Sequence, residues 1–360
     1  MNSCFGEQIS EIFISVKLHR YNNFLRANLL GNASEFLFLG QEELEEIMKK
    51  ARDLSWSHFG KRIHFYAPSF IHYEASFFRS SPDIFPSISL TGEYCALKCK
   101  HCQGKILETM IPATTPSELV EACFSLKERG CRGVLISGGC LPNGSVPLDR
   151  FAEAIAQVKR ELGLTIVVHT GIVSEPTAKK LKSAGVDAAL IDIIGSDETI
   201  REIYGLNVKV EDYAKSLEAL HSSGIPLVPH VLIGLHYGKL KGEFKSLELI
   251  SKCDPAAVIA IAFMPIHGTQ MENVEPPTPL DVARVLVAAR FMMPSTPLVL
   301  GCARPVGEHR IKTDMLAVKA GVNAIAFPAE KAVFLAKSMG LDVSFSPVCC
   351  SQIYEDIKRR

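Results

Sequence analysis

The sequence predicts an α/β protein built as a (βα)8 barrel of the TIM type. From about residue 86, short runs rich in β-branched residues alternate with helical patterns. An open doubly wound sheet is the alternative, and eight consecutive strand–helix units favour the barrel. The expected strands are Ser87–Thr91, Gly133–Ser137, Thr165–His169, Ala188–Asp192, Pro226–Ile233, Ala257–Phe263, Leu298–Gly301 and Asn323–Phe327.

Helix boundaries between these strands carry their own signals. Thr115 and Glu118 form a predicted capping box with Pro116 at the first helical position, and Thr278 begins a similar start. Gly185, Gly224 and Gly321 follow helical runs, as C-terminal stop residues do. These signals place helices between the strands.

The chain divides into three expected parts. Residues 1–84 form a mainly helical N-terminal extension, in which Gln41 to Ser55 has the clearest helical spacing. Residues 85–339 form the barrel, and residues 340–360 form a short C-terminal tail.

Composition excludes several classes of protein. The 360 residues hold 39 basic and 39 acidic side chains, so the balanced charge gives no sign of a nucleic-acid partner. No apolar run is long enough to cross a membrane, and Glu7 and Glu11 interrupt the first apolar stretch. Eleven cysteines, an odd number, do not suggest a secreted disulfide framework. We expect a soluble, cytoplasmic protein.

Three cysteines follow the first predicted strand closely. Cys95, Cys99 and Cys102 have the spacing C-x3-C-x2-C, which lets one short loop hold three corners of a [4Fe–4S] cubane and leave the fourth iron open. A zinc knuckle is the alternative, but zinc sites close with a fourth ligand at a matched spacing. The loop also lies at the carboxyl end of a barrel strand, where such folds place their chemistry.

This motif resembles the signature of the radical S-adenosylmethionine (SAM) superfamily. The resemblance implies a [4Fe–4S] cluster that reductively cleaves SAM to a 5′-deoxyadenosyl radical, and an electron donor such as ferredoxin or flavodoxin. It also implies cofactor-binding residues at the mouth of the barrel. They are His101 in the place of an aromatic residue near adenine, Ser137, Gly138 and Gly139 for the methionine amino group, Asp192 for the ribose, and His169 and Gly234. Cys140 stands where an acidic residue is usual, and His230 could touch substrate.

The barrel resembles the biotin synthase branch of that superfamily. The most similar stretches are Ala288 to Pro305 and Ala320 to Lys331. The resemblance places Arg304 where biotin synthases carry an arginine at a second cluster, which makes it a candidate catalytic residue. The places of the three further biotin synthase cysteines hold Leu135, Val167 and Val228, which cannot bind iron. An ordinary biotin synthase is therefore not expected.

Other cysteines are candidates for a different auxiliary site. Cys140 and Cys302 close predicted strands and are also candidate catalytic residues, while Cys349 and Cys350 lie in the tail. Together these four could hold a second iron–sulfur cluster that donates sulfur, and Cys4 is a further candidate. The alternative, held equally open, is two small mouth residues and an incidental pair.

Within this branch the chain looks most like the two-component, archaeal-type lipoyl synthases. The similar segments are Arg62 to Phe70 and Ser137 to Leu148. That resemblance implies sulfur insertion into a protein-bound octanoyl chain, with a lipoyl carrier protein and a second radical SAM subunit as partners. The alternatives are a hydrogenase-cofactor maturase or methylornithine synthase-like mutase acting on a small metabolite, and a non-catalytic iron–sulfur scaffold subunit.

Overall fold

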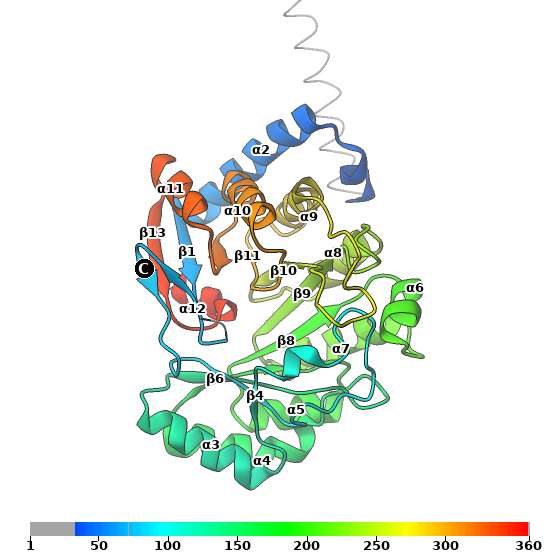
Figure 1. Ribbon diagram of the computed structural model, residues 1–360, viewed down its shortest axis with the longest axis vertical. Coiled ribbons are helices and arrows are strands. Elements are labelled where there is room, and N and C mark those ends of the chain that lie inside the picture. Colours follow the sequence, from blue (N-terminus) through cyan, green and yellow to red (C-terminus); the bar gives the residue numbers. More distant parts are fainter. Residues whose placement is uncertain (1–32, 71, 359–360) are drawn as a thin grey trace, which may run out of the picture.

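The eight predicted strands form one curled parallel sheet in the computed structural model, which describes residues 33–70 and 72–358 (Figure 1). Each strand pairs in parallel with the next along the chain, and this confirms the α/β fold of the TIM type. The strands are β4 (Ser87–Ser89), β6 (Gly133–Ser137), β7 (Thr165–His169), β8 (Ala188–Ile193), β9 (Leu227–Ile233), β10 (Val258–Ala262), β11 (Leu298–Leu300) and β12 (Ala324–Ala326).

Three more strands extend the sheet at its two edges. β1 (Arg62–Tyr66) pairs with β12 and with β13 (Asp342–Ser346), and β5 (Ile111–Pro112) pairs with β4. Among the described residues β5 and β13 do not pair, so the curled sheet is not closed. The segment expected to be mainly helical and the C-terminal tail thus each add a strand to the sheet. A separate two-stranded hairpin joins β2 (Glu74–Ala75) and β3 (Phe78–Arg79).

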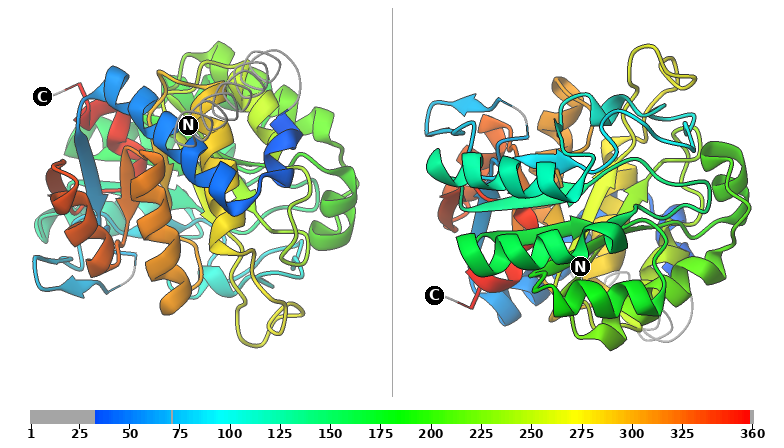
Figure 2. Two further views of the ribbon diagram at one scale, coloured as in Figure 1. Left: turned by 90° about the horizontal axis from the view of Figure 1, so that it is seen from above. Right: turned by 90° about the horizontal axis from the view of Figure 1, so that it is seen from below.

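Helices cover the outer face of the sheet, and α2 lies across α9 and α10 in the left view of Figure 2. Both predicted capping boxes are present, at Thr115 and at Thr278, and the predicted helix from Gln41 runs on to Phe59. None of the described helices has the length and apolarity that a membrane crossing requires. The α-helices are α2 (Gln41–Phe59), α3 (Pro116–Glu128), α4 (Ala152–Leu162), α5 (Glu175–Ser183), α6 (Asp197–Thr199), α7 (Val210–Ser223), α8 (Glu243–Ser251), α9 (Pro279–Met292), α10 (Glu308–Ala320), α11 (Glu330–Ser338) and α12 (Ile353–Asp356). The shorter turns are η1 (Ala33–Phe38), η2 (Lys105–Leu107), η3 (Leu148–Phe151), η4 (Ile200–Tyr204) and η5 (Cys350–Gln352).

The two faces of the sheet pack into two separate cores. Alternate residues of a strand point to opposite faces, so Ile166 and Val168 join the outer core under the helices, whereas Val167 joins the inner core. Val228 belongs to the inner core as well, and Leu135 packs against it. The three positions predicted to correspond to biotin synthase cysteines therefore contribute to an apolar barrel interior.

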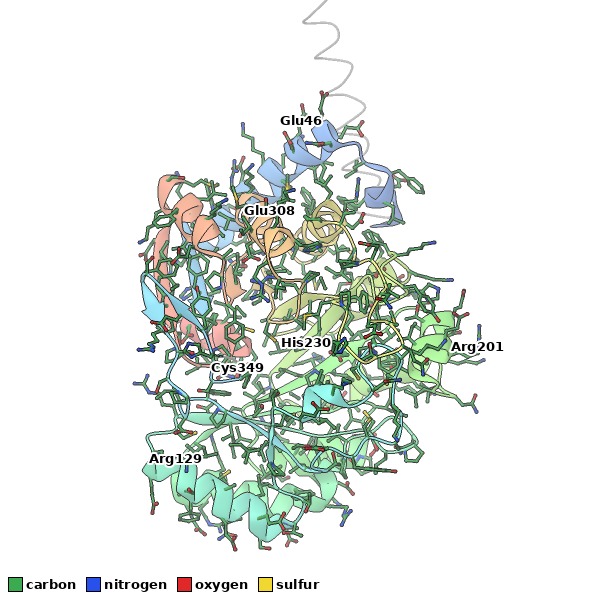
Figure 3. All side chains as sticks on the ribbon, in the orientation of Figure 1. Glu46, Arg129, Arg201, His230, Glu308 and Cys349 are labelled. Atoms are coloured by element: carbon green, nitrogen blue, oxygen red, sulfur yellow. The ribbon has the colours of Figure 1, made fainter. Side chains whose placement is uncertain are left out.

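The C-terminal tail packs into this interior. η5 contacts β8 and β12, and α12 follows it directly. The Tyr354 hydroxyl donates to the Asp187 carbonyl (2.9 Å), and the Tyr66 hydroxyl donates to the Asp356 carboxylate (2.7 Å). Figure 3 shows Cys349 next to this helix, and the Cys349 and Cys350 side chains are 4% and 5% exposed. The tail therefore carries two thiols into the barrel.

Candidate active site

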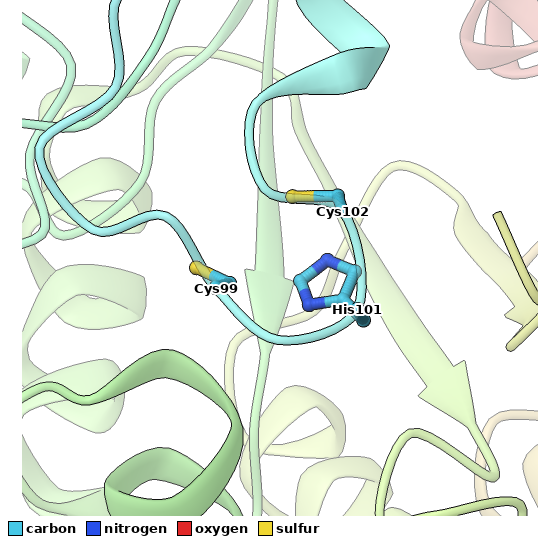
Figure 4. A group of neighbouring side chains, drawn as sticks. All are labelled: Cys99, His101 and Cys102. Carbon is cyan, nitrogen blue, oxygen red and sulfur yellow. The ribbon is translucent and has the colours of Figure 1, made fainter. Parts of the chain in front are cut away.

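Cys95, Cys99 and Cys102 lie on the loop that leaves the carboxyl end of β4. Their exposed fractions are 9%, 5% and 6%, although the loop lies at the sheet edge. Lys98 and Gln103 adopt left-handed conformations, with φ of 42° and 48°, which non-glycine residues rarely do and which are concentrated at functional sites. Figure 4 shows His101 and Cys102 pointing into the concave side of this loop, and their ligand atoms lie within 4.8 Å of that of Cys99.

Backbone hydrogen bonds hold the loop in this shape. Gln103 N–H donates to the Cys99 carbonyl (2.8 Å), and Lys105 N–H donates to the Cys102 carbonyl (2.8 Å). Lys100 N–H reaches the Ile203 carbonyl of η4 (2.9 Å), so the loop is also fixed to the segment after β8. The cysteine spacing is therefore presented by a rigid scaffold.

The environment of two of these thiols, Cys95 and Cys102, favours the thiolate, the form that binds metal. A hydrogen bond with Cys99 and the neighbouring His101 lower the pKa of Cys102 to about 4, against the opposing effect of burial. A hydrogen bond with Cys140 and backbone amides lower the pKa of Cys95 to about 5. The same contact with Cys102, together with burial, raises the pKa of Cys99. Three thiols at one loop fit three corners of an iron–sulfur cubane.

Ser137, Gly138 and Gly139 lie at the end of β6, directly against the cysteine loop. Gly139 N–H donates to the Thr91 hydroxyl (2.7 Å), and a Cβ at Gly139 would lie 2.7 Å from the Cys95 Cα. The Ser137 hydroxyl donates to the His169 carbonyl (3.1 Å). Glycine is thus needed here for the close approach of two loops, and the binding of a methionine amino group stays a prediction.

His169, Asp192 and His230 meet at the mouth of the barrel, from β7, β8 and β9. His169 Nε2 lies 3.2 Å from Asp192 Oδ1, and the two imidazole rings are 5.2 Å apart. Burial opposes charge on both partners, yet their attraction raises the pKa of His169 and lowers that of Asp192. Burial and the nearby His169 lower the pKa of His230 to about 3, so His230 is neutral.

This group leaves a polar atom without a partner. His230 Nδ1 is buried and makes no hydrogen bond, and Asp192 Oδ1 has only its ion pair with His169. Buried polar atoms are normally satisfied, so unsatisfied ones at a barrel mouth are suited to a bound polar molecule. Asp192 can accept from a hydroxyl there, as its predicted contact with ribose requires.

Tyr204 is a candidate site residue that the sequence did not reveal. Its ring lies 5.4 Å from that of His101, tilted by 58°, and both the Tyr204 hydroxyl and His101 Nδ1 are buried without a partner. Tyr204 ends η4, a π-helical turn, a conformation that is frequent at functional sites. No local pattern predicts such a turn. His101 and Tyr204 together form an aromatic wall at the cysteine loop, and the place of His101 near adenine stays a prediction.

Gly234 is fixed by the fold around it. Its φ is 73°, a Cβ there would lie 2.5 Å from Pro277, and its N–H donates to Glu243 Oε1 (2.8 Å). The amide is thus used within the protein. The conformation and the close approach of Pro277 require glycine at this position, and its contact with a cofactor stays a prediction.

The buried Glu243 should make the stability of the protein depend on pH. Burial raises its pKa to about 7, from a usual value of 4.5, against the effect of its backbone hydrogen bonds. Between these two values the folded state binds more protons than the unfolded state, so the stabilising neutral form is lost as pH rises. At pH 8 this lowers the free energy of unfolding by about 3 kcal/mol. We expect Glu243→Gln to remove this dependence.

The measurement is the unfolding free energy in urea at pH 5 and pH 8, under anaerobic conditions. The variant should be the more stable protein at pH 8, with little difference at pH 5. Glu248→Gln, at a half-exposed glutamate of the same helix, is the matched control. Equal pH dependence in wild type and Glu243→Gln would contradict the prediction.

Arg304 follows β11, as predicted, but its guanidinium is engaged within the protein, and its catalytic role stays a prediction. Its side chain is fully buried, and Nε and Nη2 donate to the two oxygens of Asp314 (2.7 and 2.9 Å). Nη1 and Nη2 also donate to the carbonyls of Gly301 (2.6 Å) and Phe327 (3.1 Å). A guanidinium held by four hydrogen bonds anchors the ends of β11 and β12, and it has little capacity left for an iron–sulfur cluster.

The predicted four-cysteine auxiliary site does not form. Cys140 lies with the cysteine loop, because Ala96 N–H donates to its carbonyl (2.9 Å) and its thiol contacts Cys95. Cys349 instead contacts Cys350, and its charge acts on Cys302. Cys4 lies outside the described residues. The candidate cysteines therefore divide into a group at the mouth and a group of three in the interior.

Comparison with known families shows which proteins the chain resembles. Residues 89–244 match the radical SAM superfamily, and residues 261–355 match the biotin and thiamin synthesis associated domain. The chain is therefore similar to radical SAM enzymes that carry this associated domain. Enzymes of the superfamily use a [4Fe–4S] cluster and SAM and require an electron donor, and biotin synthase homologues carry a second cluster.

Individual proteins and solved structures show which radical SAM enzymes the chain resembles. A biotin synthase of Aromatoleum aromaticum is 26% identical over 65% of this chain and 70% of its own length. A 3-methylornithine synthase of Methanosarcina acetivorans is 24% identical over 81% of this chain and 74% of its own. The crystal structure of a methylornithine synthase covers 92% of this chain and 99% of its own, with a TM-score of 0.61 at 19% identity. The hydrogenase maturase of Carboxydothermus hydrogenoformans has the same fold, with a TM-score of 0.62 at 16% identity over 97% of this chain and 85% of its own.

Proposed function

We propose that this chain inserts sulfur into unactivated C–H bonds of an octanoyl chain carried on a lipoyl carrier lysine. The observation that supports this most is the tail, which brings Cys349 and Cys350 into the barrel interior, close to Cys302. Cys95, Cys99 and Cys102 are the proposed ligands of the [4Fe–4S] cluster. When bound, that cluster and SAM supply a 5′-deoxyadenosyl radical, which removes a hydrogen atom from carbon.

The chain's own residues hold the reactants in this scheme. Asp192 accepts from the SAM ribose, and the wall of His101 and Tyr204 faces adenine. The apolar inner core excludes water from the interior, because Val167, Leu190 and Val228 are at most 3% exposed. Cys302, Cys349 and Cys350 hold the sulfur source, either as an auxiliary cluster on this chain or together with a second radical SAM subunit.

The interior thiols give a sharp test. We expect anaerobically reconstituted wild type to hold more than about four irons per chain, and the Cys349→Ala/Cys350→Ala variant to hold about four. Cys123→Ala, which removes a thiol from α3 on the outer face, is the matched control. Wild type with only about four irons, unchanged in the double variant, would remove the sulfur-donor role from this chain.

The substrate is tested separately. Wild type, SAM, a reductant and an octanoylated carrier domain should give 5′-deoxyadenosine and a carrier whose mass has increased by sulfur. The interior variant should still give 5′-deoxyadenosine but no sulfur-containing carrier. A carrier that is never modified, with or without a second radical SAM subunit, would rule out the proposed substrate.

The second candidate is a radical rearrangement of a small amino-acid metabolite. It is favoured by the 3-methylornithine synthase relative, which matches 81% of this chain. The ion pair of His169 and Asp192 next to the neutral His230 suits a small polar substrate. This candidate predicts turnover without a carrier protein and full activity in the Cys349→Ala/Cys350→Ala variant.

A further inference from the structure

Cys140 lies where it can act directly on the cluster, and this inference rests on the proposed cluster ligands Cys95, Cys99 and Cys102. Its backbone is pinned to the cysteine loop by the hydrogen bond from Ala96 N–H. The preceding residue, Gly139, is tied to Thr91 and has no room for a Cβ against Cys95. The loop after β6 therefore cannot move away from the cysteine loop without breaking both contacts.

The thiol of Cys140 also lies beside the cysteine loop. It lies in contact with the Cys95 thiol. Cys140 is partly buried, whereas the three proposed ligands are buried. The mouth of the barrel thus holds four sulfur atoms at a site that needs three.

A fourth thiolate has a defined place in this chemistry. Three cysteines hold three irons of a cubane, and the fourth iron must be open for the amino and carboxylate groups of SAM. Thiolate is a soft ligand that binds such iron well. A thiol in contact with one cluster ligand is within a side-chain rotation of the cubane that this ligand holds.

We propose that the Cys140 thiolate caps the fourth iron when SAM is absent, and that SAM displaces it. In this exchange one Fe–S bond breaks, and Fe–N and Fe–O bonds to SAM form. The released thiolate takes a proton from solvent, and no electron is transferred. The cap has two consequences: it protects the labile iron from loss, and it weakens SAM binding by competition.

The test is mild oxidation with ferricyanide of the reconstituted protein without SAM, followed by electron paramagnetic resonance. Loss of an uncapped iron gives a [3Fe–4S] signal. We expect Cys140→Ala to give roughly fivefold more of this signal than wild type, and addition of SAM to make the two proteins equal. Cys253→Ala, a thiol after α8 and outside the site, should behave as wild type. Equal signals from wild type and Cys140→Ala without SAM would overturn the cap.

SAM affinity gives a second readout on the same proteins. Equilibrium dialysis should show roughly tenfold tighter SAM binding in Cys140→Ala, which corresponds to 1.4 kcal/mol. Cys140→Ser keeps the size of the side chain and is used in place of Cys140→Ala if the alanine variant does not fold. Unchanged affinity in the variant that folds would also count against the cap. If wild type holds no [4Fe–4S] cluster at all, the proposed ligands fail, which is distinguishable from failure of the cap.

Discussion

Replacing any one of Cys95, Cys99 and Cys102 by alanine should abolish SAM cleavage, with at least a roughly thousandfold loss of 5′-deoxyadenosine formation. A thousandfold loss corresponds to ~4 kcal/mol in the activation barrier. The physical reason is that two thiolates cannot keep a cubane in place while its fourth iron binds SAM. The measurement is 5′-deoxyadenosine in the presence of dithionite, together with iron content.

The control for this prediction is Cys253→Ala, which should keep both cluster and cleavage. The same experiment separates the iron–sulfur site from a zinc site made of Cys99, His101 and Cys102, whose ligand atoms lie within 4.8 Å of one another. A zinc site would be colourless and would need His101. Full cleavage in a Cys95→Ala variant, or stoichiometric zinc in wild type purified anaerobically, would contradict the assignment.

The second large effect concerns Arg304 and Asp314. Removing one partner leaves the other charge buried without compensation, which costs about 3–5 kcal/mol. We expect Arg304→Met and Asp314→Asn to lower the free energy of unfolding by this amount, because both side chains are fully buried. Urea unfolding of anaerobic protein, followed by circular dichroism, measures the change.

The double variant Arg304→Met/Asp314→Leu separates a structural role from a catalytic one. If the pair acts only as an anchor, the double variant regains stability relative to Arg304→Met, since no lone charge remains, and still cleaves SAM. Arg284→Met breaks a partly exposed pair with Asp281 and should cost less than about 1 kcal/mol. A stable Arg304→Met protein that had lost only sulfur insertion would instead restore the catalytic assignment.

Much of the fold could be predicted from the sequence because its signals are local. Each of the eight strands is a short β-branched run, and helix starts such as Thr115 carry their own caps. β1 and β13 were missed because their pairing depends on contacts across the chain, with His64 beside Ala324 and Arg62 beside Asp342. Nothing in either segment specifies the partner strand.

The candidate site likewise has features that the sequence predicts and features that only the fold shows. The cysteine loop was predicted because its spacing is itself the ligand arrangement, and Asp192 because it closes a strand. The environment of Arg304 could not be predicted, since its partner Asp314 lies on α10 and the pairing follows from packing. Likewise, only the fold shows that Cys140 lies with the cysteine loop and that Cys349 lies in the interior.

The pairing of β1 with β12 and β13 constrains how the chain is assembled during synthesis. β1 leaves the ribosome early, yet its partners begin at Ala324 and Asp342, near the end of the chain. Until they emerge, β1 presents two unpaired edges, and unpaired edges favour aggregation. Such distant contacts also slow folding. The sheet around the interior can therefore be completed only after β12 and β13 have been made.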